Sequence, residues 1–545
     1  MAPYDEEEIS PDDLLTNMIV MGASLIVIAA VVIGVVAGVD SKGGPGKLGE
    51  NVTLDNMMGV DEICNQTDYK ESCMASLQPV GDKASVKKYL TAAINGTVSE
   101  MTNAMQKAKV NADAIGDQSL EKMALEDCVE LMGLSIEEMQ SVMPLEDVGD
   151  GRSSLSAVIA YQRACVEGLK ESLYASFADF DGGLQKAREL ASIILAIIYE
   201  NFPNDDARVE RQLMADQRKV LQDYKKAGGQ MIPHASVAKD GSEEYGSINA
   251  ALDAYPNDIK GRYVIYVKAG VYEENVVVAK NKTNVFMYGD GVTETIISGT
   301  NLDDTTTYRR ATLSAIGNEF ICANIGIKVP DKSSGNSIAA LKIQSDKAAF
   351  YNCRINGTTS NIYALAHRQF FKECEIYGVT NIIKGDAALV IQRSKIVVTQ
   401  PSTPVANIIT LQGRSDKREN TGFVIHGSVI VADESNSPEK LKNWTYLGMA
   451  VDKYSRTIVM ESLLGDLINA QGWSSSNNYG IENVTFAEYK NRGPGAQTKN
   501  RVNWPSHTVI TNRNDALLYT ADRFIELQKW SLDNIIGPLH AGLFS

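Results

Sequence analysis

The sequence has little positive charge and few metal-binding side chains. Its 52 Lys and Arg stand against 68 Asp and Glu, and residues 1–230 carry nearly all of the formal net charge of −16, because residues 231–545 are close to neutral. A near-neutral C-terminal half offers no basic face of the kind that nucleic acid requires, so we expect no nucleic-acid partner. Only five histidines are present, and His367, His426 and His507 lack metal-ligand spacing. We therefore predict no metal site and no cofactor.

Positive charge is absent from residues 1–17, which carry six acidic residues. They precede an uncharged apolar run, residues 18–39, whose length suits a helix that spans the hydrocarbon core of a bilayer. A cleavable signal peptide usually has a basic start and a shorter apolar core. The pattern therefore favours an acidic tail followed by a transmembrane signal anchor, which would be the contact with the membrane. A long cleaved signal peptide is the alternative.

Two signals disagree about the side of the membrane on which the rest of the chain lies. Lys42 and Lys47 follow the apolar run, and the positive-inside bias weakly places that side in the cytosol. Seven N-x-T glycosylation triplets and an even set of cysteines favour the luminal or extracellular side, which we predict. The acceptor residues of the triplets are Asn51, Asn65, Asn95, Asn281, Asn356, Asn443 and Asn483.

Residues 52–200 follow a Gly-rich linker at 40–51 and carry apolar side chains at intervals of three and four residues, which predicts a bundle of helices. An even set of cysteines in an oxidising compartment favours two disulfides over a metal site, and three pairings are possible. The four cysteines are Cys64, Cys73, Cys128 and Cys165. Residues 201–231 are polar and predict an exposed linker, the usual place for proteolytic cleavage.

From residue 232 onward, about a dozen short runs of Val, Ile, Phe and Tyr recur roughly every 10 residues, with little helix between them. This spacing suits a β-sandwich or a parallel β-helix. Cys353 and Cys374 are 21 residues apart, near the length of one β-helix coil, so a β-helix would stack them within disulfide reach. Cys322 is then the odd thiol, which we expect to be buried as a small apolar residue. A solenoid also needs end caps, and residues 523–544 are a candidate for a helical one.

The stretch from Cys353 to Ser394 resembles the core of plant pectin methylesterases. The family pattern reads C-x-F-x-G-Y-Q-D-T-L-Y, then R-Q-F-Y, then C-x-I-x-G-T-V-D-F-I-F-G-N-A-A, and this chain follows it without a gap. The matching residues are Cys353, Gly357, Tyr363, Arg368, Gln369, Phe370, Cys374, Ile376, Gly378, Gly385, Ala387 and Ala388. Further similar stretches lie at 267–276, 288–300, 412–422, 446–462 and 486–505. The resemblance implies a right-handed parallel β-helix of the pectin lyase-like kind over residues 232–545.

The N-terminal half is similar to the pectin methylesterase inhibitor family. C-N-Q-T-D-Y-K-E-S-C begins at Cys64, and A-L-E-D-C-V-E-L surrounds Cys128. This similarity implies a four-helix bundle over residues 52–200. It also implies disulfides that join the first two cysteines and the last two. In the family, a basic dipeptide followed by two leucines marks a cleavage site, and residues 211–214 and 218–221 resemble it only loosely, so a charged linker without cleavage is the alternative.

The family mechanism requires a carboxylate nucleophile, a second carboxyl group as general acid and base, and amide donors for the oxyanion. In this alignment the nucleophile falls on Asn381 and the acid-base residue on Ser360. Ser337 and Thr359 stand at the positions of the two oxyanion glutamines, and Val451 stands at that of the sugar-binding tryptophan. The substituted family positions are therefore Ser337, Thr359, Ser360, Asn381, Met449 and Val451. Met449 replaces an arginine that orients the nucleophile. An arginine at 449 would be an unpaired charge once the carboxylate at 381 is lost, so the replacement by Met449 is consistent with the replacement by Asn381.

The remaining candidate for a nucleophile is Asp386, which stands where the family has asparagine. It is five residues beyond Asn381, a distance of about 16 Å along an extended chain, so we consider it a weak surrogate. The resemblance predicts a cell-wall protein of the pectinesterase and inhibitor family that binds pectin (homogalacturonan) or acts on active pectinesterases through its helical domain, with impaired catalysis. The alternative is an active pectin methylesterase that releases pectate and methanol with water and no cofactor.

Overall fold

The protein is represented by a computed structural model. It describes residues 53–545 except 118, 173–176, 203–231, 257, 301, 303, 331–337, 358, 402–405, 436–437, 476–479 and 531. The predicted tail, anchor and first linker lie outside the described residues, as do Asn51, Ser337 and both candidate cleavage motifs. Within the described part of the chain, no helix is both long enough and apolar enough to cross a membrane.

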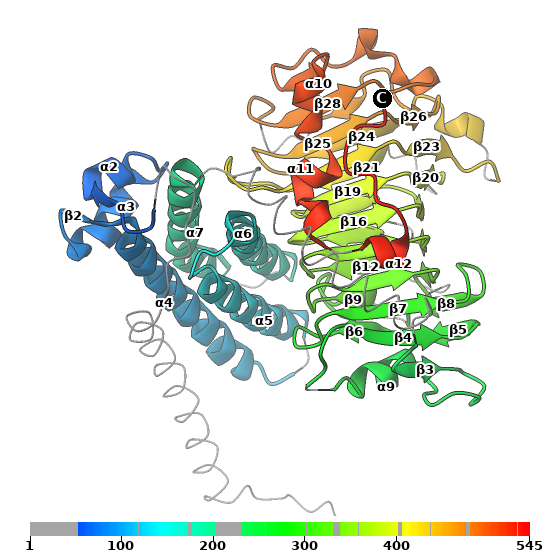
Figure 1. Cartoon of the computed structure of the whole chain (residues 1–545), viewed down its shortest axis with the longest axis horizontal. Helices are drawn as coiled ribbons and strands as arrows, with labels where there is room; N and C mark the ends of the chain where they lie inside the picture. The colour runs from blue at the N-terminus through cyan, green and yellow to red at the C-terminus, as the bar shows by residue number, and fades with distance from the viewer. Residues whose placement is uncertain are drawn as a thin grey trace, which may run out of the picture. The chain divides into compact units, whose positions relative to one another are not determined.

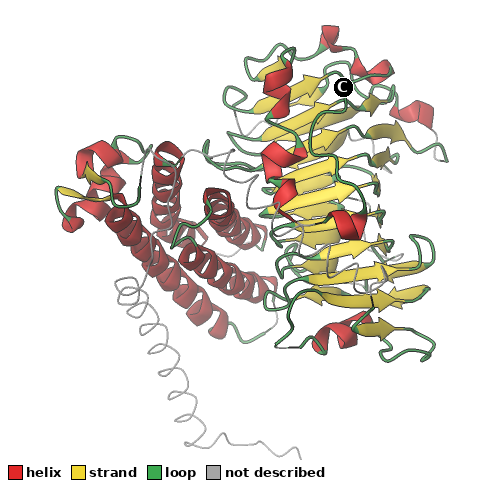
Figure 2. Cartoon of the chain, viewed as in Figure 1, coloured by secondary structure: helices red, strands yellow, loops and turns green. Residues whose placement is uncertain are grey.

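Four long helices form the N-terminal bundle (Figures 1 and 2). Polar side chains cap three of them: Ser85 accepts a hydrogen bond from the backbone N–H of Lys88, and Ser119 and Asp147 do the same for their helices. The helices are α4 (Val86–Asp113), α5 (Leu120–Ser141), α6 (Val148–Glu171) and α7 (Phe177–Asn201). Before them come β1 (Met57–Gly59), α2 (Val60–Cys64), α3 (Lys70–Leu77) and β2 (Lys83–Ser85), with β1 and β2 antiparallel.

Both bundle disulfides have the pairing that the resemblance implied. Cys64 is joined to Cys73, and Cys128 to Cys165. The first bond ties α2 to α3, and the second ties α5 to α6. All four cysteines are buried, so the bridges are part of the bundle core.

Three parallel sheets follow, and successive strands visit them in turn, as in a parallel β-helix rather than a sandwich (Figure 2). Sheet I contains β3 (Ala235–Val237), β4 (Tyr263–Val267), β7 (Val285–Gly289), β10 (Ile321–Ala323), β13 (Ala348–Tyr351), β16 (Arg368–Lys372), β19 (Ala388–Gln392), β22 (Gly422–His426), β25 (Arg456–Met460), β28 (Thr485–Tyr489) and β29 (His507–Val509). Sheet II contains β5 (Gly270–Glu273), β8 (Thr295–Ser298), β11 (Gly326–Lys328), β14 (Arg354–Asn356), β17 (Glu375–Gly378), β20 (Lys395–Val398), β23 (Val429–Ala432) and β26 (Leu463–Leu464).

Sheet III is the sheet that carries the predicted cleft. It contains β6 (Val276–Val278), β9 (Ala311–Ala315), β12 (Ala339–Ile343), β15 (Ile362–Ala364), β18 (Ile383–Gly385), β21 (Asn407–Gln412), β24 (Thr445–Ala450) and β27 (Trp473–Ser474). Ile362 of β15 lies opposite Ile383 of β18, so one coil here is 21 residues long. The interval between Cys353 and Cys374 predicted this coil length correctly. The right-handed winding stays a prediction.

Aromatic and aliphatic side chains stack along the interior of the β-helix. Phe320, Phe350 and Phe371 lie one above another on successive coils, with ring centroids 5.9 and 4.7 Å apart. Each is fully buried. Such a column removes the rings from water while every strand still pairs its backbone with both neighbours, which is why β-branched and aromatic runs form this fold.

The predicted disulfide between Cys353 and Cys374 is absent from the structure, where both residues are free thiols. The Sγ atom of Cys353 also lies 3.8 Å from that of Cys322, a residue that stands opposite Phe350 in the sheet register. Cys353 therefore has a thiol neighbour on each side. All three are buried, and Cys322 is a small apolar core residue, as expected.

The C-terminal helices cover the outer face of sheet I instead of capping the end of the solenoid, which corrects the prediction for residues 523–544. Ile525, Trp530 and Ile536 pack in one cluster with Val390 and Val424 of sheet I. The short helices are α10 (Arg513–Leu517), α11 (Ala521–Ile525), the 3-10 turn η5 (Leu527–Trp530) and α12 (Asp533–Ile536). Near the start of the β-helix, α9 (Ile248–Asp253) packs against its first coil.

Candidate functional site

The predicted cleft positions lie on neighbouring coils of sheet III. Ser360 and Asn381 each stand two residues before the strand of their coil, and the backbone N–H of Ser360 donates to the carbonyl oxygen of Thr380 over 3.3 Å. Thr359 forms a bridge with Thr380. Met449 lies within β24, two strands further along the sheet. The fold thus gathers these positions at one sheet, although Ser337 lies outside the described residues.

None of the predicted cleft residues that the structure describes carries a carboxyl group. Ser360 is buried, and both Ser360 and Asn381 have left-handed backbone conformations, with φ of 57° and 51°. Asparagine adopts this conformation more readily than most residues. The Oδ1 atom of Asn381 accepts a hydrogen bond from the hydroxyl of Thr380 over 3.4 Å. Hydroxyl and amide groups do not titrate in the range that general acid-base catalysis of ester hydrolysis requires.

Asp386, the weak surrogate, lies just beyond the opposite end of β18 and is buried. Its Oδ1 atom accepts hydrogen bonds from Nε2 of Gln412 over 3.0 Å and from the hydroxyl of Thr421 over 2.7 Å. A side chain held in this way is a structural part of the turn between sheets III and I. It does not face the cleft positions at the N-terminal end of the strand.

Asp386 also forms a carboxyl pair with Glu419. Burial raises the pKa of Asp386 to about 6, and burial together with the neighbouring Asp386 charge raises the pKa of Glu419 well above its usual range. Ionisation of Asp386 therefore disfavours ionisation of Glu419, because two neighbouring buried carboxylates repel each other. Glu419 is further fixed by the backbone N–H groups of Ser415 and Asp416.

The helical bundle packs over this end of sheet III through α6. Arg163 of α6 donates to the carbonyl oxygen of Gly413 and forms an ion pair with Asp452 over 3.7 Å. Burial raises the pKa of Tyr363, and the next cause is the charge of Glu167, one turn further along α6. The same helix therefore lies close to Tyr363 on the outer face of β15. Sequence reasoning missed Arg163, because nothing in the helical pattern distinguishes it from a solvated arginine.

A second contact between bundle and β-helix involves α5. Asp127 pairs with Arg309 over 2.5 Å and accepts a hydrogen bond from Thr306. Glu130 accepts a hydrogen bond from the hydroxyl of Tyr308 over 2.9 Å. Asp127 is buried, which raises its pKa, while the Thr306 and Arg309 hydrogen bonds oppose that shift. The acidic bundle thus meets basic and hydroxyl groups of the β-helix.

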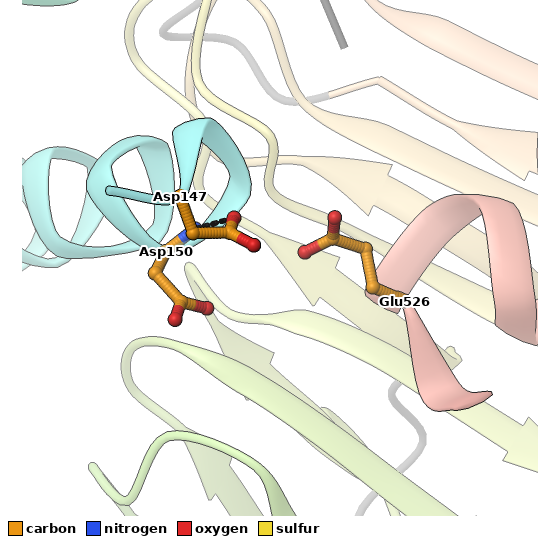
Figure 3. Close-up of side chains that lie close together, drawn as sticks. All are labelled: Asp147, Asp150 and Glu526. Carbon is orange, nitrogen blue, oxygen red and sulfur yellow. Dashed lines mark hydrogen bonds between the residues drawn. The ribbon is translucent and has the colours of Figure 1, made fainter. Parts of the chain in front are cut away.

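Three carboxylates gather where α6 begins and α11 ends (Figure 3). The oxygens of Asp147, Asp150 and Glu526 approach within 4.8 Å of one another, a spacing that a cation could bridge. Two cations of the protein already pair with them: Arg368 binds Glu526 over 2.6 Å, and Lys529 binds Asp147 over 2.8 Å. We therefore interpret the group as an ion-pair cluster that joins the bundle to the C-terminal segment.

The glycosylation triplets fall where a glycan could be accommodated. Of the seven acceptor residues, the six that the structure describes are exposed: one lies in a helix, one in a strand and four in turns or bends. They are Asn65, Asn95, Asn281, Asn356, Asn443 and Asn483. Exposure is required for modification but does not establish it, so these sites stay predictions.

Comparisons with known proteins cover both halves of the chain. Residues 234–528 match the family described as pectinesterase, and residues 59–197 match the family described as plant invertase/pectin methylesterase inhibitor. The Arabidopsis thaliana protein pectinesterase/pectinesterase inhibitor 3 is 31% identical to this chain, and the match covers all of both chains. Probable pectinesterase/pectinesterase inhibitor 23 from the same plant is 32% identical, over 91% of this chain and 93% of its own length. Among solved structures, pectin methylesterase from carrot is 38% identical with a TM-score of 0.55, over 58% of this chain and 99% of the carrot chain.

Proposed function

Since the chain belongs to the plant pectinesterase family that carries an inhibitor-like domain, we propose that it is an extracellular cell-wall protein that binds methylesterified pectin and hydrolyses it poorly or not at all. The observation that carries this proposal is the absence of a carboxyl group at Ser360 and Asn381, the positions of the family's acid-base residue and nucleophile. Binding of pectin is supported by the family membership, and the two positions precede adjacent strands of sheet III.

The size of the expected defect follows from the roles that are lost. Removal of a single oxyanion donor typically lowers kcat by about 10²–10³, and Thr359 replaces one glutamine while Ser337 replaces the other. Removal of a nucleophile is more severe, and groups that act as a unit fail together. Met449 agrees with this interpretation, because an apolar side chain needs no carboxylate partner.

An active esterase is the second candidate. It is supported by the similarity to the carrot enzyme over nearly the whole of that chain, and by the pectinesterase names of the relatives. In this candidate Asp386 would have to supply the nucleophile, or the substrate would have to bind in a different frame. The hydrogen bonds to Gln412 and Thr421 and the burial of Asp386 count against the first of these routes.

The helical domain has a proposed role of its own, as a binder of active pectinesterases. Its helices α5 and α6 are occupied by the β-helix of the same chain through Asp127 and Arg163. We infer that a second esterase could reach this face only after the bundle separates from its own β-helix. Binding in trans should therefore be weaker for the full chain than for the bundle alone.

The full chain tests the proposal directly. It is incubated with highly methylesterified pectin, bound protein is measured by co-sedimentation, and methanol is assayed in the supernatant, with the carrot enzyme as positive control. We expect protein in the pectin pellet and no methanol above a no-enzyme control. Clear methanol release would support the esterase instead, and its disappearance in Asp386→Ala would identify Asp386 as the nucleophile. Failure to sediment with pectin would contradict binding.

A further inference from the structure

A cavity of about 340 Å³ lies beyond the other end of sheet III, where the bundle, the turn after β21 and the C-terminal helices meet. Its wall combines α6, the end of α7, residues 414–420 and residues 518–526. Six basic side chains line it, against only two acidic ones, Glu419 and Glu526. The basic residues are Arg152, Arg368, Arg414, Lys417, Arg456 and Arg523.

Some of these cations already have carboxylate partners. Arg368 is surrounded by Asp150, Asp346 and Glu526, and Lys417 pairs with Asp68 over 2.6 Å. These ion pairs occupy Glu526. Burial and the charge of Asp386 raise the pKa of Glu419 well above its usual range, which disfavours a negative charge on Glu419. Arg152, Arg414 and Arg456 take no part in these ion pairs.

Three arginines have no ion pair with any carboxylate that the structure describes. Arg152 stacks over the ring of Tyr199 at 4.9 Å and donates a weak hydrogen bond to the Arg418 carbonyl over 3.4 Å. Arg414 is about 5% exposed and donates to the Lys417 carbonyl. The Nε atoms of Arg152 and Arg414 are buried without a hydrogen-bond partner.

Arg456 has the fewest interactions of the three arginines. Among the described residues its guanidinium makes no hydrogen bond and no ion pair, although it lines the cavity and the backbone N–H of the same residue is bound by Gln412. Burial, followed by the positive charge of Arg414, lowers the pKa of Arg456 to about 9. Burial also lowers the pKa values of Arg152 and Arg414. Charges that are largely withdrawn from water are normally paired in proteins, and these three guanidinium groups have no carboxylate partner among the described residues.

We propose that the pocket formed by Arg152, Arg414 and Arg456 binds a small oxyanion, either inorganic phosphate or the carboxylate of a uronic acid. Guanidinium groups present forked donors that match phosphate and carboxylate oxygens, and the unpartnered Nε atoms supply further donors. Arg152 comes from the bundle, whereas the other two come from the β-helix. The bound anion therefore bridges the two domains.

This pocket is separate from the predicted cleft. Ser360 and Asn381 precede the strands of sheet III, whereas Arg414 follows β21 and Arg456 begins β25 of sheet I. The proposal does not depend on esterase activity or on its absence. It depends only on the geometry of the turn between the two sheets and on the docked α6.

The test uses the full chain in a buffer free of phosphate and carboxylate. Thermal unfolding and isothermal titration calorimetry are measured with sodium phosphate and, separately, with galacturonate, and sodium chloride at equal ionic strength controls for screening. The variant Arg456→Gln removes the unpartnered guanidinium. Arg513→Gln is the matched control, because Arg513 is exposed on α10 and lies outside the pocket.

We expect phosphate or galacturonate to raise the unfolding temperature of the wild type and of Arg513→Gln with increasing concentration, because a ligand that binds the folded state stabilises it. Arg456→Gln should bind at least tenfold more weakly. Its unfolding temperature without ligand should equal or exceed that of the wild type, because an uncompensated charge is gone. The anion that binds more tightly identifies the source.

A purely structural role of Arg456 gives the opposite pattern. The variant would then lose stability without ligand and would keep the same response to both anions as the wild type. That pattern would overturn the proposal, as would a wild type that responds to phosphate and galacturonate no more than to chloride.

Discussion

Arg163 of the bundle donates a hydrogen bond to the carbonyl oxygen of Gly413, at the turn where sheet III passes into sheet I. The two residues are 250 positions apart in the sequence, and their contact places α6 beside the carboxyl pair of Asp386 and Glu419. The inhibitor-like domain is therefore docked on the β-helix of its own chain.

Arg163→Ala should weaken this docking. The substitution removes a hydrogen bond to a part-buried carbonyl and the partner of Asp452, so we expect the free energy of unfolding to fall by about 1–3 kcal/mol. Urea unfolding followed by circular dichroism measures the change. Lys186→Ala, which removes an exposed pair with Glu100, is the control and should change stability by less than about 1 kcal/mol. Equal effects of the two substitutions would show that Arg163 contributes no more than a surface charge.

The carboxyl pair predicts a specific pH dependence. Asp386 and Glu419 have raised pKa values in the folded state, so between the ordinary carboxyl pKa near 4 and the value of about 6 the folded chain holds protons that the unfolded chain has lost. This contribution to stability is present at the acid end and is lost as the pH rises through that window. Stability from this pair is therefore greater at pH 4 than at pH 7.

The substitution Asp386→Asn removes one of the two carboxyl groups of the pair. The asparagine keeps an oxygen atom that can accept hydrogen bonds from Gln412 and Thr421. We expect the variant to gain about 1–3 kcal/mol over the wild type at pH 7 and to lose this advantage near pH 4. Unfolding midpoints measured from pH 4 to pH 8 give the comparison, with the surface variant Asp466→Asn as control. A gain that is constant over the whole pH range would mean that no proton is shared between the two carboxyls.

The free thiols provide a third prediction. In the denatured, unreduced chain, a maleimide should label Cys322, Cys353 and Cys374, and in the native chain none of them, because all three are buried. Mass spectrometry of the labelled peptides counts the sites. A single labelled thiol would show that Cys353 is oxidised to one of its neighbours in the protein as it is made.

The sequence predicted the coils of the β-helix, but it did not predict which cysteines are neighbours inside them. The 21-residue interval between Cys353 and Cys374 indicated the coil length, because a parallel solenoid repeats its register. The same interval suggested a disulfide, but both residues are free thiols in the structure, where Cys353 also lies close to Cys322. Coil lengths that vary with turn insertions are not readable from one sequence.

Some features of the candidate sites could likewise be predicted from the sequence, and others could not. The substitutions at Ser360 and Asn381 could be read from the alignment alone, because those positions lie in a gapless stretch. The convergence of Arg152, Arg414 and Arg456 could not, since it depends on how α6 docks, and docking is decided by tertiary contacts between distant segments. The stretches 412–422 and 446–462, which contain Arg414 and Arg456, indicated only the family resemblance.

Glycan analysis tests the predicted compartment. Expressed in plant cells, the protein should shift to lower apparent mass on glycosidase treatment, because its described N-x-T asparagines are exposed. Replacing each asparagine by glutamine identifies the modified sites. An unchanged band, together with cysteines of the bundle that label without reduction, would contradict an extracellular body.

Methanol release by the β-helix, residues 232–545, tests the central claim most directly, because it removes the bundle that covers one end of sheet III. The carrot pectin methylesterase covers 58% of this chain, about the share that the fragment makes up. With highly methylesterified pectin we predict no methanol above the no-enzyme control, and none after Asn381→Asp alone, because the other groups of the unit are still missing. Joint restoration by Ser337→Gln, Thr359→Gln, Ser360→Asp, Asn381→Asp and Met449→Arg should produce turnover. Turnover by the unmodified fragment would contradict the account.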